Sequence, residues 1–191
     1  MKTKQTGIIE TVKDQIIAAI TGTGDIVQAT VDTITQTLAT AFKDTGKVGT
    51  SVTDAIAGVA SGAIRGAAHV GADLGHAARG IMIGVLRGTK DAGTAVLDTI
   101  SHTAQVAIRD TAEVGGDVEA AATGLVEGAI EGAKESGVSA EDAAAAAADG
   151  ALKAAGQVGS TAVKTVRKAV SKPINGVKVV LKEPEMAVSK N

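Results

Sequence analysis

The sequence predicts an all-α protein made of long amphipathic helices. Apolar residues recur at spacings of four, four and three, charged residues recur every eleven, and both prolines lie at or beyond residue 173. Eleven residues make three helical turns at about 3.67 residues per turn, so one face of such a helix stays apolar over a long distance. The helices are therefore expected to lie extended, to form a bundle, or to assemble as a right-handed coiled coil.

The apolar series defines a contact stripe that needs a partner. It holds its eleven-residue spacing without a slip between Val48 and Val85, and charged residues such as Asp54 and Arg65 fall nearly opposite. A two-faced helix of this kind is stable only when its apolar face is covered by lipid or by another helix. The predicted stripe consists of Val48, Val52, Ile56, Val59, Val70, Leu74, Ile81 and Val85.

Glycines and capping residues divide the chain into elements. Asp25 is a candidate N-cap, and Ser139 with Asp142 resembles a capping box. Past Pro173 the sequence partly alternates, which predicts a short strand or an extended tail. The expected helices cover 4–21, 25–45, 50–113 (as one helix or two), 117–136 and 140–171.

Four regions follow from these elements. Residues 1–22 form an N-terminal helix, 23–113 the eleven-residue-repeat region, 114–172 an Ala/Gly-rich helical hairpin, and 173–191 a C-terminal tail. In the hairpin, Glu127, Glu131 and Glu135 are expected to lie opposite the start of the second helix, with Lys153 as the first basic residue in reach.

Glycines spaced by four predict very close helix packing. A face without side chains lets another backbone approach closely. Each glycine inside a helix costs about 1 kcal/mol relative to alanine, so the 24 glycines of the chain make isolated helices weak. The close-packing glycines are Gly58, Gly62, Gly66, Gly80, Gly84 and Gly88.

The net charge of −2 hides a strong segregation of charge. Residues 110–150 carry ten acidic groups and one basic group, whereas 151–191 carry eight basic groups and two acidic ones. The basic end is expected to contact an acidic partner or an anionic lipid, or to pair with the acidic middle. Its contact face consists of Lys164, Arg167, Lys168 and Lys172.

No arrangement of side chains points to an enzyme, a cofactor or a metal. His69, Asp73 and His76 share one helical face, but we interpret them as part of the polar face of the repeat. The basic residues lack interleaved aromatic residues for base stacking, which argues against a nucleic-acid partner. The longest stretches without a charge are about ten residues, against roughly twenty for a membrane span. With no secretory signal visible, the protein is expected to be cytoplasmic and peripheral on a membrane or lipid surface.

Residues 20–110 resemble the eleven-residue-repeat proteins of lipid surfaces: perilipins, synucleins and exchangeable apolipoproteins. Stretches 23–33, 43–49 and 88–91 are similar to the Thr/Gly/Val/Lys-Asp runs of perilipin repeats. The resemblance implies helices that lie in the plane of a lipid monolayer or bilayer. The regular lysine pairs of synucleins are missing, so a preference for anionic lipid is not implied.

The sequence leaves two main functions open, with a stress-protective or other role as a third. The first is a non-enzymatic protein that associates with a membrane or lipid surface. The alternative is an oligomeric helical scaffold or stalk, which assembles with itself or with a larger complex, including one attached to a membrane.

Overall fold

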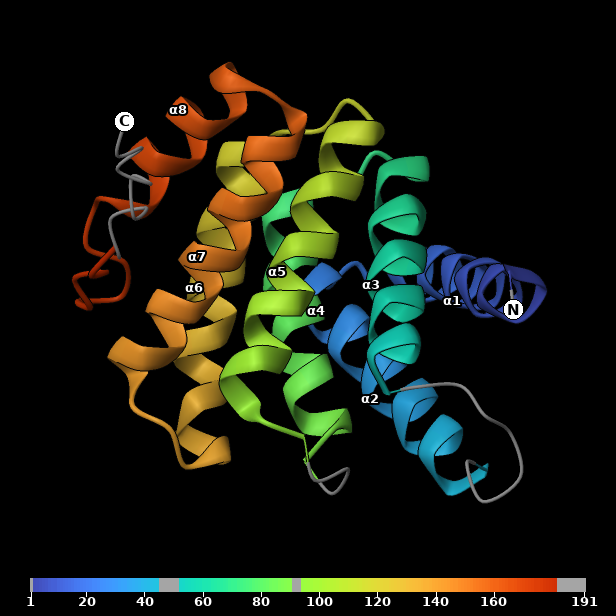
Figure 1. Cartoon of the computed structure of the whole chain (residues 1–191). Coiled ribbons are helices and arrows are strands. Elements are labelled where there is room, and N and C mark those ends of the chain that lie inside the picture. Colours follow the sequence, from blue (N-terminus) through green and yellow to red (C-terminus); the bar gives the residue numbers. More distant parts are fainter. Residues whose placement is uncertain (1, 45–51, 91–93, 182–191) are drawn as a thin grey trace, which may run out of the picture.

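The computed structural model describes residues 2–44, 52–90 and 94–181. The described residues form helices and their connections, with no strand; one isolated bridge joins Ile174 and Val177. The all-helical class expected from the sequence is thus confirmed (Figure 1). The eight helices of the described part are α1 (Lys2–Thr23), α2 (Ile26–Asp44), α3 (Val52–His69), α4 (Leu74–Gly88), α5 (Val96–Glu113), α6 (Val118–Ser136), α7 (Ala140–Val158) and α8 (Ser160–Val170).

The helices form a two-layer array. The most extensive contacts join helices two places apart in the chain: α1 with α3, α2 with α4, α4 with α6, and α5 with α7. The odd-numbered helices therefore form one layer and the even-numbered helices the other, with consecutive helices packed across the two layers. In Figure 1 α3, α5 and α7 stand side by side in front of α4 and α6.

A 22-residue unit of helix plus turn explains the eleven-residue pattern. Helices α3 to α7 begin at Val52, Leu74, Val96, Val118 and Ala140, each 22 residues after the one before. Because 22 is twice eleven, the apolar series keeps its phase through every turn and looks continuous in the sequence. The stretch 50–113, expected as one helix or two, is in fact three.

Short polar and glycine-containing turns end these helices. Gly71 has a φ of +66°, which ends α3, and Asp73 caps α4 by accepting a hydrogen bond from the His76 amide at 2.7 Å. The caps expected at Asp25 and Ser139 are present; their side chains accept amide hydrogen bonds at 3.0 Å. The last expected helix instead divides at Gly159, which has a φ of +149°.

The core is continuous through both layers and consists of aliphatic side chains. Ile16, Ile34, Ile64, Ile100 and Leu125 are fully buried in it. Beyond α8 the chain lies on the array as an irregular segment, anchored by the buried Ile174 and Val179. This segment is the described part of the expected tail.

Candidate functional site

The apolar contact stripe lies inside the array. Its buried members are Ile56, Val59, Leu74, Ile81 and Val85, and its half-buried members are Val52 and Val70. Val48 lies outside the described residues. The stripe was expected to contact lipid or a second chain, but here it fills the core of its own chain. The turns after His69 and Gly88 fold the helices back, so each helix covers the apolar face of another.

The glycine rows also act within the chain. A Cβ at Gly62 would lie 2.6 Å from the carbonyl oxygen of Ile9 in α1, and a Cβ at Gly80 would lie 2.8 Å from that of Val27 in α2. No side chain fits at such distances, so these backbones are in direct contact. Gly58, Gly62 and Gly66 face α1; Gly80, Gly84 and Gly88 face α2; Gly124, Gly128 and Gly132 face α4.

Arginine–glutamate pairs link neighbouring helices of one layer. Arg79 in α4 donates to Glu131 in α6 at 2.7 Å, and Arg87 donates to Glu135 at 2.8 Å. The hydrogen bond from Arg87 lowers the pKa of Glu135, while burial opposes this shift. These contacts correct the expectation that both glutamates face the start of α7. Lys153 pairs with Asp149 of its own helix instead, at 2.7 Å.

The basic contact face is fully on the surface. Helix α8 buries Ala162, Val166, Ala169 and Val170 against the array. Its basic residues lie on the other side, with Lys172 just beyond the helix, and none forms an ion pair with a described residue. The exposed set is Lys164, Arg167, Lys168 and Lys172. No described residue neutralises the charge of this face.

Helix α5 breaks the glycine pattern, which the sequence reasoning missed. Steps of 22 residues from Gly58 and Gly66 lead through Gly80 and Gly88 to His102 and Asp110. Helix α5 contains no glycine, so its packing on α3 has no backbone-to-backbone contact of the kind seen elsewhere. Three buried side-chain atoms there have no hydrogen-bond partner among the described residues: His102 Nε2, Asp110 Oδ2 and Thr111 Oγ1. Alignment of the 22-residue units would have revealed the exception.

His69, Asp73 and His76 lie around the start of α4, where Asp73 acts as the helix cap. Asp73 accepts hydrogen bonds from the backbone amide of His76 at 2.7 Å and pairs with its ring Nδ1 at 2.8 Å. The amide bond is the main reason why the pKa of Asp73 is lowered. Across the described residues, no three His, Cys, Asp or Glu side chains are grouped so that they could hold a metal ion.

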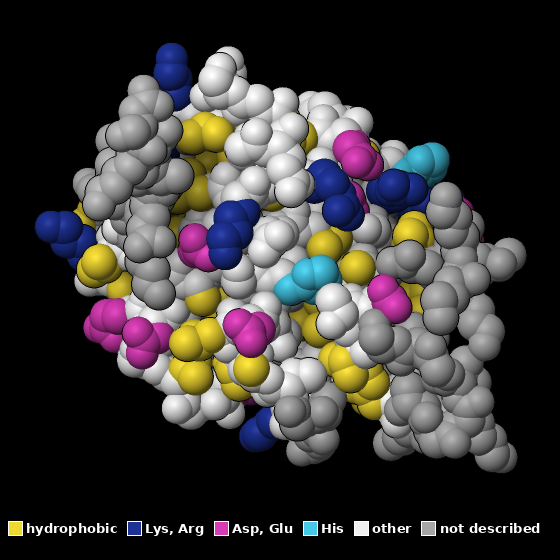
Figure 2. Space-filling model, viewed as in Figure 1, with side chains coloured by type: hydrophobic (Ala, Val, Ile, Leu, Met, Phe, Trp, Pro, Cys, Tyr) yellow, Lys and Arg dark blue, Asp and Glu magenta, His cyan; other side chains and the backbone are white. Residues whose placement is uncertain are grey.

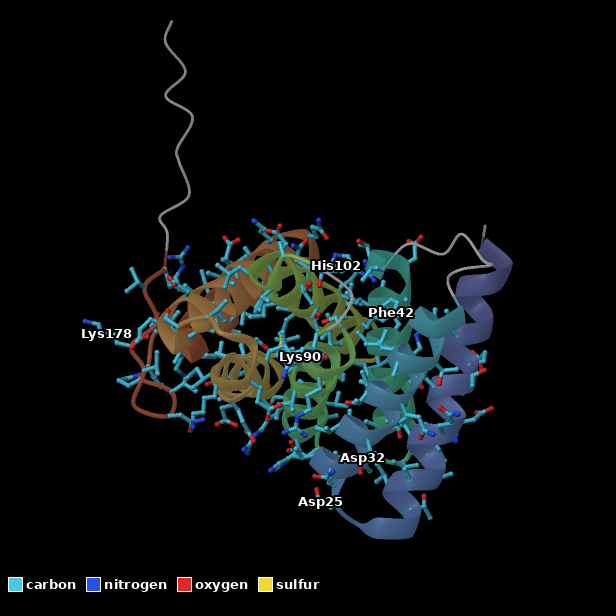
Figure 3. All side chains as sticks on the ribbon, turned by 90° about the horizontal axis from the view of Figure 1, so that it is seen from below. Asp25, Asp32, Phe42, Lys90, His102 and Lys178 are labelled. Atoms are coloured by element: carbon cyan, nitrogen blue, oxygen red, sulfur yellow. The ribbon has the colours of Figure 1, made fainter. Side chains whose placement is uncertain are left out.

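Two grooves flank the first half of α5 on the odd-numbered layer. The groove between α5 and α7 has a volume of about 330 Å³, and the groove between α3 and α5 about 270 Å³. Asp98 lines both grooves, and His102 lines the second. Figure 3 shows His102 at the edge of the molecule opposite Asp25 and Asp32. Both grooves mix acidic, hydroxyl and aliphatic groups.

The chain is similar to a designed protein in fold alone. The crystal structure of the de novo designed helical repeat protein DHR7 matches 88% of this chain and 91% of that chain, with a TM-score of 0.53 and 19% sequence identity. No protein-family model matches the sequence, and no curated protein matches it. The similarity therefore supports the helical-repeat architecture described above.

Proposed function

We propose that this protein is a non-enzymatic helical-repeat scaffold whose outer faces bind other macromolecules. One observation carries the proposal: most described members of the apolar stripe, and the glycine rows, pack against other helices of the same chain. The surface features of the array are the arginine–glutamate pairs between helices, the two grooves beside α5, and the basic face on α8. Helical-repeat arrays present extended surfaces of this kind to their partners.

The same observation weakens the coiled-coil alternative between chains. A right-handed coiled coil would need Val52, Ile56 and Val59 as its seam, and the array already buries Ile56 and Val59. We therefore propose the folded single chain as the working form. Its partners then reach it through surface residues.

Association with a lipid surface is the second candidate. The chain has 24 glycines and one aromatic residue, so its helices are individually weak and its core lacks the large rings that normally add burial. Lipid could compete for the stripe by opening the array. Among the described residues, no helix combines the length and the hydropathy needed to cross a membrane, so this association would be peripheral.

A single introduced cysteine tests the two candidates against each other. The chain has no cysteine, so Val59→Cys places the only thiol at a position that is 1% exposed. For a scaffold, this thiol should be labelled slowly with or without phosphatidylcholine or phosphatidylserine vesicles. The exposed position Asp54→Cys is the matched control in the same helix and should be labelled fast throughout.

The scaffold and the lipid-associated protein predict different labelling results. Slow labelling at position 59 together with a constant helix content by circular dichroism supports the scaffold. Labelling that accelerates with vesicles, with protein floating on the vesicle fraction, supports lipid association and overturns the scaffold as the working form.

A further inference from the structure

Among helices α1 to α7, α5 packs on α3 less extensively than any other pair two places apart in the chain. The other pairs meet through glycines, such as Gly62 on α1 and Gly128 on α4. Helix α5 instead presents His102, Val106 and Asp110 to α3, because these residues share one helical face and His102 lines the groove between the two helices. We call the contact of these three residues with α3 the α3–α5 seam.

The seam buries two polar side chains that are incompletely hydrogen-bonded. Asp110 is 1% exposed, and its Oδ1 accepts a hydrogen bond from Arg109 Nε at 3.2 Å. Its Oδ2 and the Nε2 of His102 are buried and have no hydrogen-bond partner in the described part of the chain. Polar atoms buried in this way lose their hydrogen bonds to water and regain them when water reaches them. The closed seam is therefore less favourable than the glycine contacts beside it.

Both ends of the seam are loosely closed. At one end lies the groove of about 270 Å³, where Val52 and Ile56 of α3 form the lining together with His102. Figure 2 shows hydrophobic side chains at the surface around the junction of α3 and α5. At the other end Arg65 and Glu113 approach only to 3.7 Å. Water can therefore enter the seam without first breaking a close ion pair or a backbone contact.

The even-numbered layer behind the seam is held more firmly. Arg87 of α4 pairs with Glu135 of α6 at 2.8 Å, and the Gly75 carbonyl oxygen leaves no room for a Cβ at Gly124. The α1–α3 and α5–α7 contacts on either side of the seam also bring glycines against carbonyl oxygens. An opening of the odd-numbered layer is thus confined to the seam, with the α4–α6 contact as its hinge.

We propose that the array opens reversibly at the α3–α5 seam and bends about the α4–α6 contact. In the open state water bonds to His102 Nε2 and Asp110 Oδ2, which offsets the lost contact between α3 and α5. Opening also widens the odd-numbered face and exposes Val52 and Ile56 more fully. The curvature of a helical-repeat array follows from the packing of successive units. The inference rests on the proposed scaffold function and adds how the binding surface changes shape.

Distances between two spin labels test the opening. Because the chain has no cysteine, Arg65→Cys with Glu113→Cys places labels only on the two sides of the seam. Arg87→Cys with Glu135→Cys is the matched control, since it removes an equivalent ion pair at the same sequence separation across α4 and α6. Pulsed electron paramagnetic resonance without vesicles should give two distances for the seam pair. The longer one should exceed the shorter by about 3 Å or more, because water must fit between the helices. The control pair should give one distance.

Two variants connect the open state to the buried polar groups. Asp110→Ala removes the unpartnered carboxylate, and His102→Leu replaces the imidazole by an apolar side chain of similar size. Each should reduce the population of the longer distance at least twofold, because closing no longer buries that unpaired atom. Asp32→Ala removes the same charge from the exposed face of α2 and should leave both distances unchanged. If Asp110→Ala does not fold by circular dichroism, His102→Leu carries the test.

A single distance for the seam pair, as narrow as that of the control, would overturn the proposal. Two distances in both pairs would show that the whole array opens, which also overturns it. So would a longer population that neither His102→Leu nor a folded Asp110→Ala changes, since the buried polar groups would not be its cause. These measurements use no lipid. Labelling at position 59 that accelerates with vesicles would therefore overturn the scaffold and leave the seam distances as they are, and a closed seam would leave the scaffold standing.

Discussion

Arg87 and Glu135 form a two-pronged ion pair between α4 and α6, with Nη2 donating to Oε1 at 2.8 Å and Nε donating to Oε2 at 3.1 Å. Arg65 and Glu113 have the same 48-residue separation and join α3 to α5, but their closest N···O distance is 3.7 Å. The α4–α6 and α3–α5 interfaces thus pair residues at the same sequence separation, but the arginine and glutamate are closer between α4 and α6. Glycine accounts for the difference, because α6 meets α4 through Gly128 whereas α5 has no glycine.

The Arg87–Glu135 pair predicts a small loss of stability in acid. The pKa of Glu135 is lowered in the folded chain, so the pair's contribution is present above the ordinary carboxyl pKa of 4.5 and is lost as the pH falls through the lowered value. Thermal melts of the unaltered chain and of Glu135→Gln should therefore differ at pH 6 and converge as the pH falls below the lowered pKa of Glu135. Both side chains are partly exposed, so the difference should be modest. A constant difference across this range would show that the ion pair contributes nothing.

Glycine-to-alanine changes should have opposite effects at two helical positions. In an open helix the change stabilises by about 1 kcal/mol, and Gly156 in α7 has no atom within 4 Å of a new Cβ. At Gly80 the new Cβ would lie 2.8 Å from the Val27 carbonyl oxygen and from Thr30 Cβ. Gly80→Ala should therefore destabilise by about 1–3 kcal/mol, and Gly156→Ala should stabilise. Urea unfolding followed by circular dichroism measures both, and equal signs would contradict the close approach of α4 and α2.

The helical class and many helix ends were predictable because they depend on local chemistry. Asp25 and Ser139 cap helices through hydrogen bonds to amides three residues ahead, and a sequence shows such spacing directly. The number of helices was not predictable from the apolar pattern. A 22-residue unit keeps an eleven-residue pattern in phase across each turn. The break before Leu74 therefore leaves no mark on the pattern, and the break before Val96 only places Thr89 at one apolar position.

Two buried threonines in α5 should respond oppositely to valine. Thr111 is 0% exposed and its Oγ1 has no hydrogen-bond partner in the described part of the chain. Thr103 is also 0% exposed, but its Oγ1 donates to the Thr99 carbonyl oxygen at 2.7 Å. Replacing an unpartnered buried hydroxyl by a methyl group removes a desolvation cost of about 1–3 kcal/mol. Thr111→Val should therefore raise the free energy of unfolding, and Thr103→Val should lower it. If Thr111→Val also destabilises, its hydroxyl has a partner such as a buried water.

As with the fold, some of the site residues could be predicted from the sequence and others could not. The basic set around Arg167 was found because a charged helical face can be read at 3.6 residues per turn. The stripe around Val59 was assigned to an outside partner because periodicity shows that a face is apolar and not what covers it. The covering elements are other helices of the same chain, brought there by turns at Gly71 and Gly137.

The exposed basic end predicts a salt-dependent contact with anionic surfaces. Changing Lys164, Arg167, Lys168 and Lys172 to Gln removes four charges that are exposed and have no described acidic partner. Retention on a sulfonate column and binding to phosphatidylserine vesicles should both drop, and the remaining binding should depend less on salt, because exposed charges are screened over about 10 Å at 0.1 M salt.

The matched control removes the same number of charges from scattered positions. Lys90, Lys134, Lys153 and Lys178 are exposed and lie on different elements, so their change to Gln alters net charge without removing a face. Because basic residues in the last turn of α8 also favour its macrodipole, the first variant should lose about 0.3–1 kcal/mol of stability. Equal losses of vesicle binding in the two variants would show that net charge, and not the arrangement on α8, governs the contact.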